Sequence, residues 1–398
     1  MSQQEHFDIA ILWRSLGPYH LARAAAAAEA LTAIGGRVTV IELCDSEETR
    51  DWAELRKDRP FAISTLSPGQ KLTASTPDLS NRLVSVLNEI GPSHIAIAGY
   101  DRPEMRTALQ WTKKSGANAI LMSETKWDDN ARPWWKRWIL SRIVRQFDAG
   151  LVSGGAAGEY LISLGMPRER VFRQYGAVDN AFFQRHSDSY RSARPWPPHG
   201  EESYFIACCR IIEERKNLCG LLDAYQIYRE QVEFPWRLVI CGDGQDRSLV
   251  EKKIREDRIE AVELVGFKQA RELADLYAGA SCFVHTAFRE AWGLVVNEAM
   301  AAGLPVLVSR RCGCMYDLVH EGINGYSFDP YESSELAFLM RQVSQLSDNQ
   351  RTEMGQASQR IVGRFGVENF AAGLLNATGH WTAATSYGRS KTKEAETV

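Results

Sequence analysis

The sequence predicts an α/β protein built from two doubly wound domains of similar size, with a cleft between the edges of their sheets. Short apolar runs alternate along the chain with helical segments of about ten to fifteen residues, a pattern typical of parallel sheets with helices on both faces. This alternating series starts twice. Between the two series, residues 186–200 are rich in proline and lack periodicity, which indicates a linker.

Length and composition agree with two globular domains. The chain has 398 residues, 44% of them hydrophobic and 24% charged, and its net charge is −3. A nucleic-acid-binding protein would show a strong basic excess, so nucleic acid is not an expected partner. No run approaches the ~20 apolar residues of a membrane-spanning helix, and the N-terminus lacks the basic and apolar regions of a signal peptide. We therefore expect a cytoplasmic protein with reduced cysteines.

The first domain is expected to span residues 1–185. Its first strand, Asp8–Trp13, leads through a loop containing Gly17 into an alanine-rich helix that ends near Ile34. A single glycine does not make a Gly-x-Gly-x-x-Gly dinucleotide fingerprint. The strands and helices expected after this helix are Arg37–Leu43, Phe61–Thr65, Asp78–Ile90, His94–Ala98, Pro103–Ser115, Asn118–Met122, Pro133–Phe147, Ala149–Val152 and Gly155–Leu164.

The second domain is expected to span residues 201–365 and to repeat the same alternation. Its expected strands are Ser203–Cys209, Arg237–Cys241, Val262–Val265, Ser281–Thr286 and Pro305–Val308. Its expected helices are Leu218–Tyr228, Asp246–Arg255, Ala270–Gly279, Leu294–Ala302, Met315–His320 and Ser333–Leu346. The polar residues 385–398 are expected to form a disordered tail.

The stretch Phe288–Ser309 carries the strongest functional signal. It reads as a loop, a helix and a strand, and the loop brings Glu290 and Gly293 to the start of the helix, with Glu298 further along it. A helix start beside a glycine offers free backbone N–H groups and a positive dipole end to an anion. Carboxylates accept hydrogen bonds from hydroxyls, so the pattern favours a ligand with phosphates and sugar hydroxyls.

Two cations are expected at the same edge of the second sheet. Arg210 and Lys216 follow the first strand of that domain, and the carboxyl ends of parallel strands meet at one edge. Together with the helix start they predict a diphosphate site that needs no metal. The only close cysteine pair, Cys312 and Cys314, lacks the further ligands of a zinc site, and no metal is predicted.

A helix in the first domain has an unusual composition. With ~100° per residue, one face is aliphatic and the opposite face is aromatic and basic. The aliphatic face comprises Ile139, Leu140, Ile143, Val144 and Phe147. The aromatic and basic face comprises Trp134, Trp135, Trp138, Arg142 and Arg145. This second face suits a membrane interface with anionic headgroups, an acceptor carrying phosphate, or packing under a neighbouring loop.

The second domain resembles the donor domain of the retaining glycosyltransferases of family 4, which have the GT-B fold. The resemblance covers about residues 200–375 and extends loosely to Val171–Phe183. It rests on five motifs in a fixed order. These are Arg210 with Lys216-Asn217, Gly242-Asp243-Gly244, Val265-Gly266-Phe267, Glu290-x7-Glu298 and Gly322–Pro330.

The resemblance implies a role for each matching residue. Arg210 and Lys216 would hold the phosphates of a nucleoside diphosphate-sugar, and they would form the catalytic set together with Glu290. Glu290 would accept hydrogen bonds from the sugar, and Glu298 from the ribose. The positions that it places around the donor are Gly17, Arg210, Lys216, Asn217, Gly242, Gly244, Phe267, Glu290, Trp292, Gly293, Leu294 and Glu298. The donor is a co-substrate, so no cofactor is expected.

The acceptor side departs from the family pattern. The first loop has Gly17 where the family often has a glycine pair, and Glu124 lies where it often has a histidine. We assign Arg14, His20 and Glu124 to the acceptor side. His20 could act as a general base or could be a helix-surface or core residue. Residues 366–384 resemble the terminal helix that crosses back to the first domain.

These observations predict a cytoplasmic, metal-independent, retaining glycosyltransferase, with possible peripheral contact with the inner membrane. Its acceptor would be a glycan, a lipid-linked sugar or a small molecule held by the first domain. Two alternatives stay open. One is an epimerase or phosphorylase of the same fold, although no lysine motif for a pyridoxal cofactor is evident. The other is a noncatalytic protein that binds nucleotide-sugars.

Overall fold

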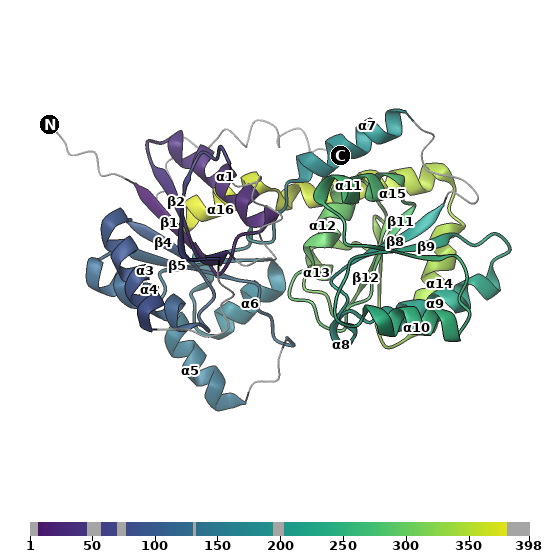
Figure 1. The fold of residues 1–398 in the computed structure, drawn as a ribbon, viewed down its shortest axis with the longest axis horizontal. Helices are drawn as coiled ribbons and strands as arrows, with labels where there is room; N and C mark the ends of the chain where they lie inside the picture. Colours follow the sequence, from purple (N-terminus) through teal and green to yellow (C-terminus); the bar gives the residue numbers. More distant parts are fainter. Residues whose placement is uncertain (1–6, 46–56, 70–76, 130–132, 194–202, 380–398) are drawn as a thin grey trace.

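The structure, a computed structural model, describes residues 7–45, 57–69, 77–129, 133–193 and 203–379. They form two α/β domains side by side (Figure 1), and each domain has one parallel sheet. The predicted fold class is confirmed. The expected tail and residues 194–200 of the expected linker lie outside the described residues.

The first sheet has seven parallel strands in the order β3-β2-β1-β4-β5-β6-β7. They are β1 (Asp8–Trp13), β2 (Arg37–Asp45), β3 (Ala62–Pro68), β4 (His94–Ala98), β5 (Asn118–Ser123), β6 (Ala149–Val152) and β7 (Val171–Phe172). The central strand β1 is buried along its whole length because helices cover both faces of the sheet. The strand order reverses between β1 and β4, which is where ligands bind in such sheets.

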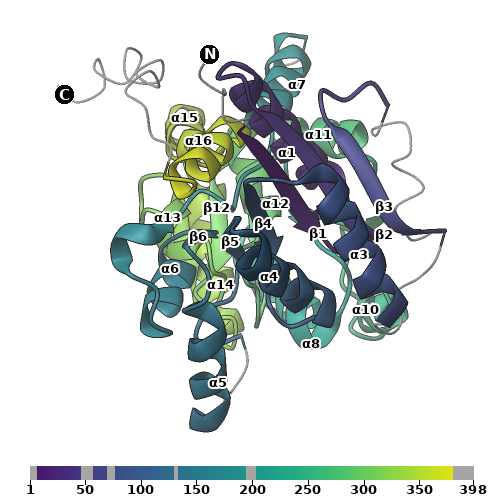
Figure 2. The same cartoon turned by 90° about the vertical axis from the view of Figure 1, so that its left-hand side faces the viewer.

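Helices pack on both faces of the first sheet. They are α1 (Pro18–Thr32), α3 (Pro77–Ile90), α4 (Pro103–Ser115), α5 (Trp134–Val144), α6 (Gly155–Ser163) and the 3₁₀ helix η2 (Arg168–Arg170). The alanines of α1 lie in the core on one face, and α3, α4 and α6 cover the other. Helix α5 lies at the lower edge of this domain in both views (Figures 1 and 2).

The second sheet has six parallel strands in the order β10-β9-β8-β11-β12-β13. They are β8 (Tyr204–Cys208), β9 (Arg237–Cys241), β10 (Val262–Gly266), β11 (Cys282–His285), β12 (Val306–Ser309) and β13 (Gly325–Phe328). The order again reverses between the first strand of the domain, β8, and its fourth, β11. In sheets of this kind ligands bind at the carboxyl ends of the strands, beside such a reversal.

The helices of the second domain include two α-helices that the sequence did not predict. They are α8 (Glu213–Lys216), α9 (Leu218–Gln231), α10 (Arg247–Glu256), α11 (Ala270–Gly279), α12 (Leu294–Ala301), α13 (Met315–Leu318), α14 (Ser333–Ser344), α15 (Asp348–Val362) and the 3₁₀ helix η4 (Gly363–Phe365). The unpredicted helices are the short α8, in a segment expected to be a charged loop, and α15. Helix α15 begins with a capping box at Ser347, and it buries Met354, Ala357 and Val362.

Two helices connect the domains. Helix α7 (Asn180–Ser192) includes residues 186–192, which were expected to be linker. It forms because the Asp179 side chain accepts a hydrogen bond from Phe182 N at 2.9 Å, and because Phe183 is buried in the second domain's core. Helix α16 (Val367–Ala377) follows the second domain and packs beside α1 in the core of the first (Figure 1).

Candidate active site

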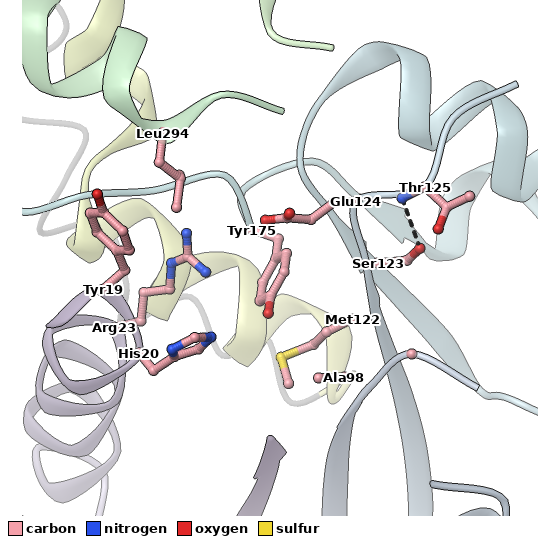
Figure 3. Close-up of a pocket in the computed structure, with 11 residues that line it drawn as sticks. Tyr19, His20, Arg23, Ala98, Met122, Ser123, Glu124, Thr125, Tyr175 and Leu294 are labelled. Atoms are coloured by element: carbon pink, nitrogen blue, oxygen red, sulfur yellow. Dashed lines mark hydrogen bonds between the residues drawn. The ribbon is translucent and has the colours of Figure 1, made fainter. Parts of the chain in front are cut away.

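A pocket of about 360 Å³ lies at the carboxyl edge of the first sheet and reaches the start of α12 in the second domain. Its position matches the strand reversal between β1 and β4. Figure 3 shows side chains from α1, from the loop after β5 and from α12 around this space. The lining residues are Tyr19, His20, Arg23, Ala98, Gly99, Met122, Ser123, Glu124, Thr125, Tyr175 and Leu294.

Glu290 lies in the loop between β11 and α12, where two partners hold it. Lys216 Nζ donates a hydrogen bond to Glu290 Oε2, and His285 Nε2 lies 3.5 Å from the same oxygen. Burial alone would raise the pKa of Glu290, but His285 and Lys216 outweigh burial and hold the pKa well below its usual range. Glu290 is therefore a carboxylate at neutral pH, fixed at the entrance of α12.

The start of α12 concentrates positive charge beside this pair. Gly293 has a φ of 104°, a left-handed conformation that favours glycine, and Leu294 begins the helix. The first N–H groups of a helix have no partner within the helix, and its dipole is positive there. Arg210 is exposed after β8 and makes no ion pair or hydrogen bond within the described part of the chain. A helix start of this kind is a favourable place for an anion.

Glu298, in the middle of α12, connects the two domains. Its side chain is 2% exposed. Oε1 accepts a hydrogen bond from the Tyr19 hydroxyl of α1 at 2.7 Å, and Oε2 accepts one from the Tyr277 hydroxyl at 3.1 Å. Burial raises the pKa of Glu298 to about 7, although both hydroxyls act in the opposite direction. The Tyr19 hydroxyl thus occupies one oxygen of this carboxylate.

Comparison with known proteins assigns the second domain. Residues 191–361 match the family model of the group 1 glycosyl transferases. The second domain is therefore similar to the group 1 glycosyltransferases. The chain is 32% identical over 175 residues to a GDP-mannose-dependent alpha-mannosyltransferase of Mycobacterium tuberculosis, covering 43% of this chain and 41% of that protein. It is 37% identical over 104 residues to O-antigen chain mannosyltransferase B of Escherichia coli, covering 25% and 26%.

Solved structures extend the likeness to the whole fold. HepE of Anabaena, in complex with UDP and glucose, superimposes with a TM-score of 0.72 at 17% identity, covering 94% of this chain and 100% of that one. A glycosyltransferase of Rickettsia africae gives a TM-score of 0.71 at 11% identity, covering 94% and 98%. The two-domain architecture is thus the GT-B fold. The chain spans only about a quarter to two fifths of the length of the curated relatives it matches.

Two of the predicted donor residues of the second domain are enclosed by protein. Asn217 caps α9 by accepting from Gly220 N at 3.2 Å, and its Nδ2 donates to Pro330 O at 2.7 Å. Both the oxygen and the nitrogen of its side-chain amide therefore form hydrogen bonds within the domain. Trp292 is 2% exposed and contacts the first domain at Gly154 and Gly176. It fills the interface between the domains instead of facing the pocket.

Glycines make this contact possible. A Cβ added at Gly154 would lie 2.3 Å from the Trp292 ring, and one at Gly176 would lie 2.5 Å from it. The Trp292 indole N–H donates to Asn297 Oδ1 at 2.9 Å, and Asn297 Nδ2 donates to Gly176 O at 3.0 Å. The first domain thus contacts the loop that carries Glu290 through Trp292 and holds it in place.

The remaining predicted donor residues lie at the sheet edges. Gly242 and Gly244 follow β9 and pack closely against the backbone of the loop after β8. Phe267, after β10, is 57% exposed and is open to stacking. Gly17 precedes α1, and its N–H donates to the side chain of His20 at 3.0 Å.

The predicted acceptor residues divide into two groups. His20 and Glu124 line the pocket, whereas Arg14 is exposed at the end of β1 and does not line it. Burial and the charge of Arg23 lower the pKa of His20 to about 3, so His20 is neutral. Its Nδ1 accepts from Gly17 N, which leaves the proton on Nε2. His20 is therefore placed as a hydrogen-bond donor and not as a general base.

The sequence did not predict the roles of Tyr19, Arg23 and Tyr175. Tyr19 and Arg23 lie on α1, one helical turn apart, and Tyr175 follows β7. The sequence signal that could have indicated these roles was the presence of Tyr19 and Arg23 in an otherwise alanine-rich helix. Their partners are more than 150 residues away in the sequence.

The aromatic and basic face of α5 is exposed. Trp134, Trp135 and Trp138 are 81%, 47% and 54% exposed, and Arg142 stacks over Trp138 at 3.6 Å from the ring centroid. Ile139, expected on the buried face, is 44% exposed, because only the last turn of the helix reaches the core. In the ranges that the structure covers, no helix is long and apolar enough to cross a membrane.

Proposed function

We propose that this protein is a retaining, metal-independent glycosyltransferase. It would transfer a sugar from a nucleoside diphosphate-sugar to an acceptor held by the first domain. The observation that carries the proposal is the Lys216–Glu290 pair at the start of α12, in the same domain as the exposed Arg210. HepE, whose fold is similar, is described in complex with UDP-glucose, which supports a donor of this class.

The geometry suits the charge changes of such a transfer. The bond between the anomeric carbon and the donor phosphate breaks, and negative charge develops on the leaving phosphate oxygen. Lys216 and the start of α12 are positive groups fixed before the reaction, which is the arrangement that stabilises such a transition state, and the exposed Arg210 would add a further cation. Glu290, as a carboxylate, would accept hydrogen bonds from sugar hydroxyls and keep the anomeric carbon in place. Retention follows from the resemblance to family 4, and proton NMR of the first-formed product tests it.

Metal independence rests on the positive groups of the site. Two cations and a helix dipole supply the charge that a divalent ion supplies elsewhere. Within the described ranges, no three His, Cys, Asp or Glu side chains form a group that could hold a metal ion. The proposal predicts equal transfer rates in excess EDTA and in added Mg²⁺ or Mn²⁺. A tenfold loss in EDTA that Mn²⁺ restores would disprove it.

The decisive experiment is a transfer assay with a panel of nucleoside diphosphate-sugars. Glu290→Gln should reduce turnover at least tenfold while nucleoside diphosphate still binds, because the change weakens the pairing with Lys216 and the contact with the sugar but leaves both cations in the site. Lys216→Met should reduce turnover by a factor on the order of 10²–10³, as for other fixed donors to a developing oxyanion. Glu335→Gln is the matched control, because Glu335 forms an ion pair with Arg310 in the same domain and lies away from the pocket.

The same assay separates the two alternatives. An epimerase would change the sugar of the donor without any acceptor, and a phosphorylase would require free phosphate. A noncatalytic binding protein would show a donor-dependent increase in melting temperature but no turnover. At a hundredfold excess of ligand over its dissociation constant, that stabilisation is about 2.7 kcal/mol.

We also propose that the exposed face of α5 contacts anionic membranes. Residues 130–147 contain five lysines and arginines and no aspartate or glutamate, although the whole chain is acidic. Exposed tryptophans beside cations suit the interface between headgroups and acyl chains. Vesicle flotation should therefore recover the protein with phosphatidylglycerol vesicles and much less with phosphatidylcholine vesicles.

Two double variants test this surface, and each removes one aromatic side chain together with the arginine that stacks on it. Replacing Trp138 and Arg142 with alanine should abolish the preference for anionic vesicles. Replacing Phe338 and Arg341 with alanine should not, because these residues form a comparable exposed pair on α14. Equal recovery with both lipids, or equal effects of both double variants, would exclude contact through α5.

A further inference from the structure

Arg23 is a buried cation that no role described so far explains. It lies on α1, is 1% exposed, and lines the pocket between the domains. A buried charge is costly unless it is paired, and arginine remains charged at any ordinary pH. The partners of this guanidinium group therefore have to be accounted for.

The protein satisfies only part of the guanidinium group. Nε donates to Ala177 O at 2.9 Å, and the guanidinium carbon lies 4.7 Å from the centre of the Tyr175 ring. These contacts fasten α1 to the segment after β7. Nη2 is buried and has no hydrogen-bond partner among the described residues. A purely structural role explains the hydrogen bond of Nε and the stacking on Tyr175. It does not explain why Nη2 is buried without a partner among the described residues.

Glu124 faces the same space without neutralising Arg23. Figure 3 shows both side chains pointing into the pocket, from α1 and from the loop after β5. No ion pair joins them among the described residues, so room for a ligand remains between them. Burial raises the pKa of Glu124, while the charge of Arg23 opposes this effect. His20 adds a neutral N–H donor on the same side.

We infer that Arg23 binds a carboxylate or phosphate group of the acceptor, and that Glu124 accepts a hydrogen bond from an acceptor hydroxyl. A carboxylate or phosphate matches the planar N–H groups of arginine and would complete the pairing of Nη2. A volume of about 360 Å³ is within the range of small-molecule sites. Because Leu294 forms one wall, the bound molecule would lie next to the start of α12.

This inference rests on the proposed function, because it takes the bound molecule to be the acceptor of the transfer. Its test measures only the binding of that molecule. Saturation-transfer NMR and titration with D-glucuronate and glucose 6-phosphate, each compared with glucose, report whether an anionic group is recognised. The carboxylate and phosphate arms distinguish the two kinds of anion. We expect at least one anionic probe to bind at least tenfold more tightly than glucose. If neither anionic probe binds more tightly than glucose, the inference is wrong.

Substitutions test whether the preference for the anionic probe depends on Arg23. Arg23→Met should remove the preference for the anionic probe, and Arg23→Lys, which keeps the charge but loses the planar group, should weaken it. Arg191→Met is the matched control, because Arg191 Nε also donates to a carbonyl, Ala278 O at 3.0 Å, outside the pocket. Arg210→Met should leave probe binding intact, because Arg210 lies on the donor side.

Donor binding separates this inference from the proposed function. Nucleoside diphosphate should bind Arg23→Met and the parent protein with the same affinity. A parallel loss of nucleoside diphosphate affinity would place Arg23 at the donor and overturn the inference. Conversely, absence of sugar transfer together with anion binding at Arg23 would refute the proposed function and leave the anion site in place. If Arg23→Met does not fold, the comparison of probes on the parent protein and the Arg23→Lys variant still decides.

Discussion

Replacing Tyr19 with phenylalanine should tighten the binding of a nucleoside diphosphate. In the structure the Tyr19 hydroxyl donates to Glu298 Oε1 at 2.7 Å. The resemblance to family 4 assigns this carboxylate to the ribose, so the donor has to displace the tyrosine. Above pH 7, where Glu298 is mainly a carboxylate, a hydrogen bond to this charged group contributes roughly 1.5–3 kcal/mol, which corresponds to an affinity gain of at most about 10- to 150-fold.

Isothermal titration with the diphosphate of the active donor measures this effect. Tyr277→Phe is the matched control, because its hydroxyl contacts the other oxygen of Glu298 from within the second domain. Both variants should destabilise the ligand-free protein by about 1–3 kcal/mol, since each leaves a buried acceptor without a donor. Only Tyr19→Phe should increase affinity. Unchanged or weaker binding by Tyr19→Phe would refute displacement of Tyr19 by the ribose.

Three further changes test other parts of the site. Burial raises the pKa of Glu298 from 4.5 to about 7, so the free energy of unfolding should fall by up to about 3 kcal/mol as the pH rises through this window. Glu298→Gln should flatten that dependence, as measured by urea unfolding from pH 5 to 8. Trp292→Ala should cost about 3–5 kcal/mol of stability, measured the same way, because it empties the domain interface. Lys216→Met should bring the pKa of Glu290 closer to its ordinary value, which carboxyl NMR titration detects.

Local patterns were sufficient to predict the two sheets except for their short edge strands, β7 and β13. Each central strand is a short apolar run bounded by glycine or polar residues, and a strand buried on both faces needs nothing else. The same holds for the start of α12, where Gly293 and the carboxylates stand within a few residues of one another. Helices α7 and α15 were missed because their polar surfaces obscure the few residues that they bury, such as Phe183 and Met354.

The interface between the domains could not be predicted in this way. Tyr19 and Glu298 are separated by 279 positions in the sequence. Gly154 and Gly176 look like ordinary loop glycines until the Trp292 ring is placed beside them. Helical periodicity placed Ile139 in the core, but burial depends on where the helix meets the domain. Arg23 likewise shows its unusual burial only once its helix is docked.

The position of α16 has a consequence for the order of folding. Phe370 and Leu374 are fully buried in the core of the first domain, beside the alanines of α1. Synthesis on the ribosome proceeds from the N-terminus, so most of the first domain emerges long before these two side chains. Until residue 377 is released, the apolar face of α1 that α16 covers in the folded protein lacks this partner. The first domain is the first to be synthesised and the last to be finished.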